Sequence, residues 1–342
     1  MNILLLSMPD SFEHMPSQAI RMPNGGLTSL AGNLDPHHRV AVADLILVQG
    51  RVRETVTRLV QELQPDIVGL SVMTFQRRTA GRIIELVRAL KPDLKIVVGG
   101  YDPSLVPDAY EPWQVDYLVR GEGEVTLCEL LRSMEQGGEI PAIPGLSVRG
   151  ANGWIHNQAR SPHRLETGEI RLPRRDARVL TGYTMIGRQV DVVETSRGCT
   201  YDCSFCSIIE MRGRNFFTYS FDRVLDDIRD ARDRGARTIF LVDDNIMLNV
   251  RRFEALCEAI IAAGLNVTGG PSAIATFMEG RRAGCTPITL TRGLLSLTAH
   301  ATPEISPPPP MGATTASTSG TCCRISSPMV PCPAMTTSSS NG

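Results

Sequence analysis

Five short apolar segments alternate with helical segments in the first 140 residues, and this alternation restricts the possible fold more than any other feature of the sequence. Each apolar segment ends at a polar or glycine-rich turn, as buried parallel strands do. The segments are 3–6, 40–47, 67–71, 96–98 and 117–119. Between them, residues 52–63 and 83–90 repeat apolar side chains with a helical period. The pattern predicts an α/β fold with a doubly wound parallel sheet.

Glycine and polar residues follow three of the predicted strands. An open parallel sheet binds ligands beyond the carboxyl ends of its strands, and glycine lets the backbone approach a ligand closely. The alternative is that these glycines only form tight turns, but several such turns at one sheet edge favour a binding site. The predicted cofactor-binding residues here are Ser71, Gly99, Gly100, Gly121, Glu122 and Gly123.

Three cysteines follow the apolar segment 190–193 with the spacing C-x3-C-x2-C, namely Cys199, Cys203 and Cys206. A structural zinc site takes four ligands, and no second cysteine or histidine pair follows within reach. Three thiolates can instead hold three irons of a [4Fe-4S] cluster and leave the fourth iron open. Cys257 lies on an apolar helical face, which predicts a buried core thiol.

The first 140 residues resemble the cobalamin-binding domain found ahead of radical S-adenosylmethionine (radical SAM) enzymes. The similar stretches are the opening strand, residues 25–30, "VVGGYDPSLVP" and "VDYLVRGEGE". The resemblance implies that the loops at the sheet edge bind cobalamin.

Some cobalamin domains supply a histidine to cobalt from a D-x-H-x-x-G motif after the first strand, and this sequence has none there. In the nearest match, residues 35–40, we interpret His37 and His38 as solvated turn residues at the opposite sheet edge. His14 stands alone in the correct loop and is interpreted as structural. We therefore expect no histidine of this domain to ligate cobalt.

The cysteine loop, residues 199–206, resembles the signature loop of the radical SAM superfamily, including the aromatic Phe205 before its last cysteine. The resemblance implies that the three cysteines bind a [4Fe-4S] cluster, that S-adenosylmethionine chelates the open iron beside Phe205, and that its reductive cleavage yields a 5'-deoxyadenosyl radical. It also implies that Asp243 or Asp244, after the strand 238–242, holds the methionine amine. Helix capping by either aspartate is an equal alternative.

As a member of this family, the protein is expected to act on an unreactive carbon of a small molecule by methyl transfer, cyclisation or rearrangement. An electron donor such as flavodoxin or ferredoxin is implied. The alternative from another class is a non-catalytic module that binds cobalamin, or zinc through its cysteines.

The chain divides into four predicted parts. They are a cobalamin-binding domain at 1–140, an interdomain segment at 141–189, a partial radical SAM barrel at 190–266 and a tail at 267–342. The basic residues of the interdomain segment are interpreted as solvated. The tail is rich in Ser, Thr and Pro, which predicts disorder or a frameshift, and hence a truncated barrel with little or no turnover.

Composition excludes several other classes of protein. Lys+Arg 35 against Asp+Glu 36 leaves a formal charge of -1, so no basic field indicates nucleic acid. No apolar run approaches a membrane span or a signal peptide, and nine cysteines without a paired framework favour a reducing compartment. The sequence thus predicts a cytoplasmic protein with a small-molecule ligand.

Overall fold

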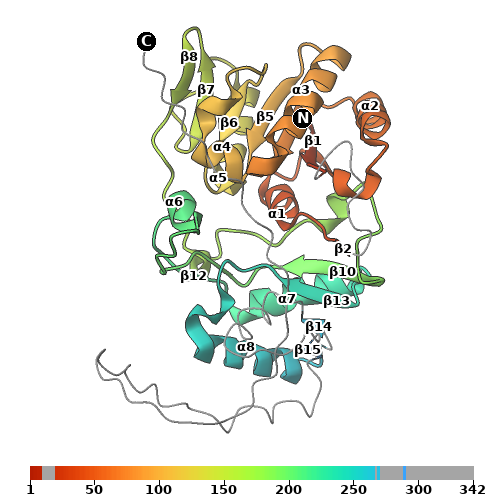
Figure 1. Cartoon of the computed structure of the whole chain (residues 1–342), viewed down its shortest axis with the longest axis vertical. Coiled ribbons are helices and arrows are strands. Elements are labelled where there is room, and N and C mark those ends of the chain that lie inside the picture. Colours follow the sequence, from red (N-terminus) through yellow and green to blue (C-terminus); the bar gives the residue numbers. More distant parts are fainter. Residues whose placement is uncertain (10–19, 266–267, 270–287, 290–342) are drawn as a thin grey trace, which may run out of the picture. The chain divides into compact units, whose positions relative to one another are not determined.

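The computed structural model describes residues 1–9, 20–265, 268–269 and 288–289, all within one compact unit, Met1–Ser296 (Figure 1). Its first sheet has seven strands in the order β3-β1-β4-β5-β6-β7-β8. The parallel strands are β1 (Asn2–Ser7), β3 (Arg39–Asp44), β4 (Ile67–Ser71), β5 (Lys95–Gly99) and β6 (Tyr117–Val119). Taken alone, these five follow the second-first-third-fourth-fifth order of flavodoxin-like sheets. The predicted α/β fold is confirmed.

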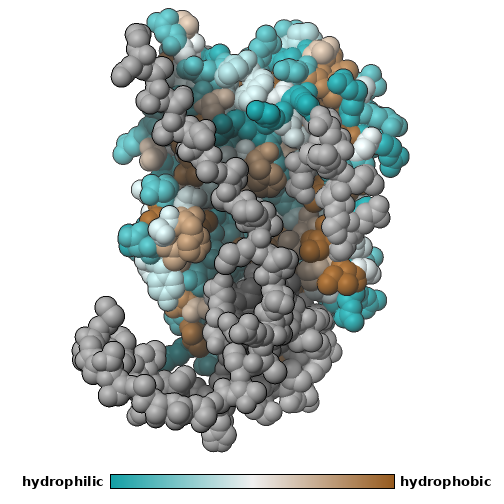
Figure 2. Space-filling model, in the orientation of Figure 1, coloured by the Kyte–Doolittle hydropathy of each residue, from teal (hydrophilic) through white to brown (hydrophobic). Residues whose placement is uncertain are grey.

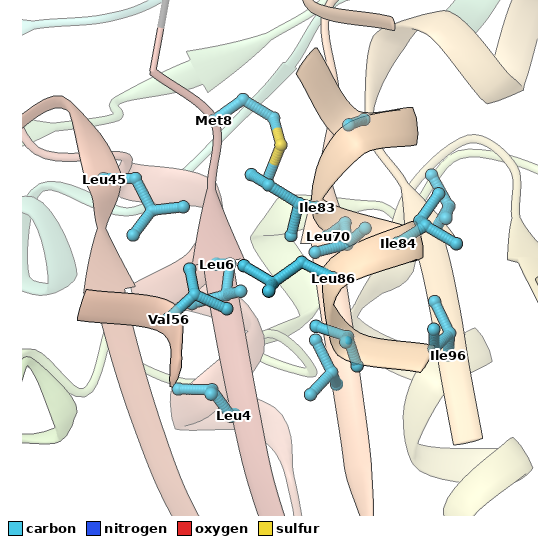
Figure 3. Packing of buried hydrophobic residues seen from close by; sticks show 14 of the residues in the cluster. Leu4, Leu6, Met8, Leu45, Val56, Leu70, Ile83, Ile84, Leu86 and Ile96 are labelled. Carbon is cyan, nitrogen blue, oxygen red and sulfur yellow. The ribbon is translucent and has the colours of Figure 1, made fainter. Parts of the chain in front are cut away.

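Helices cover both faces of this sheet. Helices α1 (Gly25–Asn33) and α5 (Gly123–Gln136) pack on one face, and α2 (Val52–Leu63) and α3 (Arg77–Leu90) pack on the other. Because successive strand side chains point to opposite faces, the apolar residues 3–6 of β1 contribute to both cores. Its Ile3 and Leu5 contact the α1/α5 core, while Leu4 and Leu6 contact the α2/α3 core (Figure 3).

Two features of the first sheet differ from the prediction. The second apolar segment, predicted as a strand over 40–47, leaves the sheet after Asp44 because Leu45–Val48 turns into a 3-10 helix. The sheet also continues into the predicted interdomain segment, where β7 (Leu146–Gly150) and β8 (Gly153–His156) add antiparallel. The turn at Gly150–Gly153 joins them as a hairpin. These two strands are too short for an alternation of apolar residues to reveal them in the sequence.

The second sheet has the order β15-β14-β13-β10-β9-β2. Its parallel strands β10 (Arg188–Val193), β13 (Thr238–Leu241) and β14 (Thr268–Gly269) alternate along the chain with helices α7 (Phe221–Asp233) and α8 (Val250–Ala262). This is the expected start of a (β/α) barrel, and β14 adds a third parallel strand to the two units predicted.

Short elements complete the described fold. Strand β2 (Ile20–Arg21), near the N-terminus, pairs with β9 (Thr184–Met185), so the first part of the chain contributes to the second sheet. The others are α4 (Tyr101–Leu105), β11 (Ser196–Arg197), α6 (Ile208–Arg212), β12 (Phe217–Thr218), β15 (Ile288–Thr289), and the 3-10 helices Thr74–Gln76, Pro107–Tyr110, Leu165–Thr167, Arg175–Ala177 and Ile246–Asn249.

The interpretation of the interdomain basic residues as solvated was wrong for Arg175. Its side chain is 2% exposed and lies 2.5 Å from Asp227 and 3.0 Å from Asp230, both on α7. It also lies 3.2 Å from Asp191 on β10, which Arg178 contacts at 2.7 Å. The composition of one segment does not reveal acidic partners that are distant in sequence, so the burial of this arginine was missed.

The prediction of a disordered or frameshifted tail falls almost entirely outside the described residues. Within the described part, no helix combines the length and the apolar character needed to cross a bilayer. On the face seen in Figure 2, hydrophobic residues of that part appear as scattered groups among hydrophilic ones.

Candidate cofactor site

A pocket of about 490 Å³ lies at the carboxyl edge of the first sheet. One wall comes from the sheet-edge loops and the start of α1, and the other from residues on both sides of the cysteine loop. Seven predicted cofactor-binding residues line it: Ser71, Gly99, Gly100, Gly121, Glu122, Gly123 and Asp244. The topology explains this gathering, because parallel strands bring their carboxyl ends to the same edge.

Gly100 is the glycine that the pocket most requires. Its φ is +99°, and a Cβ atom there would lie 2.8 Å from the backbone nitrogen of Val72. The two loops cross closely, since the Val72 N–H donates to the Gly99 carbonyl at 2.9 Å and the Asp102 N–H donates to the Val72 carbonyl at 3.0 Å. Only glycine satisfies both the backbone conformation and the close approach.

Asp102 anchors the same loop from beneath. Its buried carboxylate accepts two hydrogen bonds of 2.7 Å from Arg77 and one of 2.8 Å from Tyr110. Burial alone would raise the pKa of Asp102, but these partners outweigh it and lower the pKa. On the pocket side, the hydroxyl of the neighbouring Tyr101 contacts the hydroxyl of Ser207, directly after the last cysteine. The sheet-edge loop and the cysteine loop therefore touch.

Asp243 positions the strand that leads into the cysteine loop. It accepts hydrogen bonds from the Thr195 N–H at 2.7 Å, the Thr195 hydroxyl at 2.5 Å and the Ser196 hydroxyl at 2.6 Å. Burial raises its pKa, and these donors oppose the rise. Asp244 accepts from the Gly198 N–H at 2.7 Å. Helix α8 is capped instead by Asn249, so the capping alternative is wrong for both aspartates.

The cysteine loop leaves its three thiols within reach of a ligand. Cys199 and Cys206 are half-buried and Cys203 is exposed, and the Cys206 N–H donates to the Cys203 carbonyl at 3.0 Å. The Asn245 side-chain amide lies 3.5 Å from the Cys199 sulfur. Phe205 is 90% exposed and does not line the pocket. By contrast, Cys257 is buried, which confirms its interpretation as a core thiol, and Cys128 is buried as well.

The spacing of the sulfurs bears on which metal group these residues fit. Thiolates around one tetrahedral zinc ion, with Zn–S bonds of about 2.3 Å, stand about 3.8 Å apart. Among the described residues, the three cysteines do not form a group whose ligand atoms all lie within 4.8 Å of one another. A cluster in which each thiolate binds a separate iron needs the wider spacing. Three thiolates are one fewer than a structural zinc site takes and match the number that holds a cluster with one open iron.

A buried network of charges joins the two walls of the pocket. Arg197, two residues before Cys199, donates at 2.7 Å to Glu124 and at 2.7 Å to Glu194, and lies 3.4 Å from Glu122. Glu122 also accepts from Arg212 at 2.6 Å. The sequence prediction named Glu122 as a cofactor residue but missed this network. An arginine beside the first cysteine and a second glutamate in the same turn are the signals that could have indicated it.

Burial and charge shift the acidic groups of the network in different directions. Burial would raise the pKa of Glu124, but the charge and hydrogen bond of Arg197 prevail and lower it to about 2. For Glu194, which also lines the pocket, burial prevails and raises the pKa. The two carboxylates share Arg197, and its effect on the pKa outweighs that of burial at Glu124 but not at Glu194.

None of the described histidines lines this pocket, although the backbone N–H of His163 donates to Glu122 at 2.8 Å. His37 is exposed, but His38 is buried, so the interpretation of His38 as a solvated residue was wrong. A turn signal in the sequence does not show that the ring folds back under a neighbouring helix. His14 lies outside the described residues.

Comparisons with known proteins agree with this geometry. Residues 20–131 match the B12 binding domain and residues 193–282 match the Radical SAM superfamily, the latter extending beyond the break predicted near residue 266. The chain is 29% identical over 283 residues to the uncharacterized methyltransferase PH0819 of Pyrococcus horikoshii, covering 82% of this chain and 61% of that protein. It is 30% identical to the cobalamin-dependent radical SAM methyltransferase TokK of Streptomyces tokunonensis, covering 58% of this chain and 30% of that protein.

A solved structure shows the same fold. The chain matches the radical S-adenosylmethionine methyltransferase TsrM of Kitasatospora setae, with cobalamin and a [4Fe-4S] cluster bound, at a TM-score of 0.63 and 22% identity. The match covers 77% of this chain and 52% of that chain. The fold and site thus define a two-part protein of the B12-binding radical SAM class. The chain belongs to the family of radical SAM proteins that contain a B12 binding domain, and spans 61% or less of the relatives named here.

Proposed function

We propose that the protein is a cobalamin-dependent radical SAM enzyme that transfers a methyl group to an unreactive carbon of a small molecule. One observation carries the proposal: a single pocket is lined both by the sheet-edge loops and by residues adjoining the cysteine loop. Two groups bound by these elements would face each other across it. Methyl transfer is proposed because the first relative and the matching solved structure named above are methyltransferases by name, while other relatives are cyclases by name.

In this proposal Cys199, Cys203 and Cys206 hold the [4Fe-4S] cluster. When bound, the cluster and S-adenosylmethionine supply the radical chemistry, and cobalamin supplies the methyl group. The chain binds and orients these groups. Asp244 fixes the backbone at Gly198, directly before the first cysteine, and also lines the pocket, where it would accept a hydrogen bond from the methionine amine.

Cobalamin is proposed to lie over the sheet-edge loops. Gly100 and Gly121 allow close backbone approach, and Ser71 offers a hydroxyl at the end of β4. No histidine of the described residues reaches this pocket, so we propose that cobalt receives no histidine from it. A small cytoplasmic electron-transfer protein such as flavodoxin or ferredoxin is proposed as the electron donor.

Anaerobic reconstitution with iron, sulfide and cobalamin tests the proposal. We expect a brown protein that binds iron and sulfide, is reduced by dithionite and retains cobalamin after gel filtration. Cleavage of S-adenosylmethionine is followed separately as release of 5'-deoxyadenosine. A colourless protein that releases no 5'-deoxyadenosine, and that holds a zinc ion which is lost when Cys199, Cys203 and Cys206 are replaced by Ser, would overturn the enzymatic proposal and favour the non-catalytic module.

A further inference from the structure

A second group of metal-binding side chains lies at the opposite edge of the first sheet, outside the pocket. The candidate ligand atoms of His37, His38 and Glu135 all lie within 4.8 Å of one another. His37 Nε2 is 2.9 Å from Glu135 Oε1 and 3.0 Å from Oε2, and His38 Nδ1 is 3.5 Å from Oε1. Three donors thus converge from two segments that are nearly a hundred residues apart in sequence.

The chemistry of His38 suits a ligand. Its side chain is fully buried, and Nδ1 lies 3.5 Å from Glu135 Oε1. Nε2 has no hydrogen-bond partner, which leaves Nδ1 as the nitrogen that faces polar neighbours. The Met1 ammonium lies 3.4 Å from Nδ1 and 3.9 Å from Glu135 Oε1, so an ion at this site would take its place.

The solvent exposure and the charge of this group also suit the binding of a metal ion. The side chains of His37 and Glu135 are 58% and 33% exposed, so an ion can enter from solvent and keep water as a remaining ligand. The other nearby carboxylate, Asp35, is held by two hydrogen bonds of 2.7 Å from Arg132. Glu135 is therefore the carboxylate left to balance the charge of an ion.

We propose that His37, His38 and Glu135 bind one divalent transition-metal ion, with zinc as the probe of choice. A set of two imidazoles and one carboxylate binds zinc, nickel and copper in preference to calcium and magnesium. The ion would fasten the turn before β3 to the last turn of α5, next to the Asp35–Arg132 ion pair. This structural site is independent of the proposed enzymatic function.

Equilibrium dialysis of the full-length protein against zinc tests the site. Cys199, Cys203 and Cys206 are each replaced by Ser in the background, so that the cysteine loop contributes no thiolate. We expect His37→Ala and Glu135→Gln each to weaken the affinity for one equivalent of zinc by about 100-fold or more. Loss of a residue that only supports a metal ligand already lowers metal affinity 10–100-fold, and these two residues are proposed as ligands themselves. His37 is exposed, so its loss should leave the fold intact, as circular dichroism would verify.

His156→Ala is the matched control, since His156 also pairs with a carboxylate, Asp108, at 2.9 Å but belongs to no such group in the described part of the chain. It should bind zinc like the background protein. Zinc should also raise the melting temperature of the background protein and of the control but not of His37→Ala. Equal zinc binding by the background protein and both site variants would overturn the proposal, as would the lack of a bound equivalent in the background protein.

Discussion

Arg197 Nη2 donates a hydrogen bond of 2.7 Å to Glu124 Oε1, and both side chains are 6% exposed. Glu124 lies in the first turn of α5, at the edge of the first sheet, and Arg197 lies two residues before the first cysteine. This pair therefore ties the loops that we propose for cobalamin to the loop that we propose for the cluster.

Glu124→Gln should destabilise the protein by about 1.5–3 kcal/mol, because it removes the charge of one of the three carboxylates around the buried Arg197, while Glu194 and Glu122 remain. Urea unfolding of the wild type and the variant measures the difference. The control is Glu62→Gln, which breaks the exposed pair of Arg58 and Glu62, whose side chains are 50% and 56% exposed. That change should cost about 1 kcal/mol or less. Equal costs would contradict the assigned role.

The pair of Arg197 and Glu124 also predicts that the stability of the protein depends on pH in the acidic range. Arg197 lowers the pKa of Glu124 from its ordinary 4.5 to about 2, against the opposing effect of burial. A lowered pKa in the folded state contributes stability that is present above the unfolded value and is lost as the pH falls through the folded value. Between pH 4.5 and pH 2 the wild type should therefore lose more stability than Glu124→Gln. An equal loss of the free energy of unfolding in the two proteins over this pH range would contradict the prediction.

Cys203→Ser should reduce the iron bound after anaerobic reconstitution, because each thiolate is proposed to hold a separate iron. Cys257→Ser should leave iron content unchanged and lower stability, since burial raises the pKa of that thiol to about 11 and keeps it protonated. Iron analysis and thermal unfolding of both variants check the two results. Equal loss of iron in both would refute the assignment of the cluster ligands.

Gly100→Ala should cost more than Gly50→Ala and should weaken cobalamin binding. Both glycines have positive φ, +99° and +86°, so each alanine has a similar backbone strain of about 1–2 kcal/mol. Only at Gly100 does a Cβ meet backbone, 2.8 Å from the Val72 nitrogen, whereas at Gly50 nothing lies within 4 Å. The steric clash should add about 1–3 kcal/mol. Unfolding curves give the cost, and cobalamin titration reports the pocket.

Arg175→Met should destabilise the protein by about 3–5 kcal/mol, since it removes the cation that lies 2.5 Å from the buried Asp227. Burial already raises the pKa of Asp227, and without Arg175 that pKa should rise further. Arg229→Met is the control, since Arg229 lies on α7, the helix that carries Asp227. Its pair with Asp226 is exposed, so denaturant unfolding should detect a change of about 1 kcal/mol or less.

Local patterns in the sequence determined much of the fold. The strands 67–71 and 117–119 and the helix 52–63 have the predicted bounds, because the periods of apolar residues follow directly from strand and helix geometry. The buried Cys257 was predicted for the same reason. The cysteine spacing is likewise a local feature, and it indicated the family before any fold was known.

Only the tertiary structure decided how distant parts of the chain meet. The burial of Arg175 and His38, the pairing of Arg197 with Glu124, and the addition of β7 and β8 to the first sheet all join segments whose partners lie elsewhere in the sequence. Their charges and polar atoms look solvated when each segment is considered alone. Whether such a group is buried depends on the partner that compensates its desolvation, and the folded chain supplies that partner.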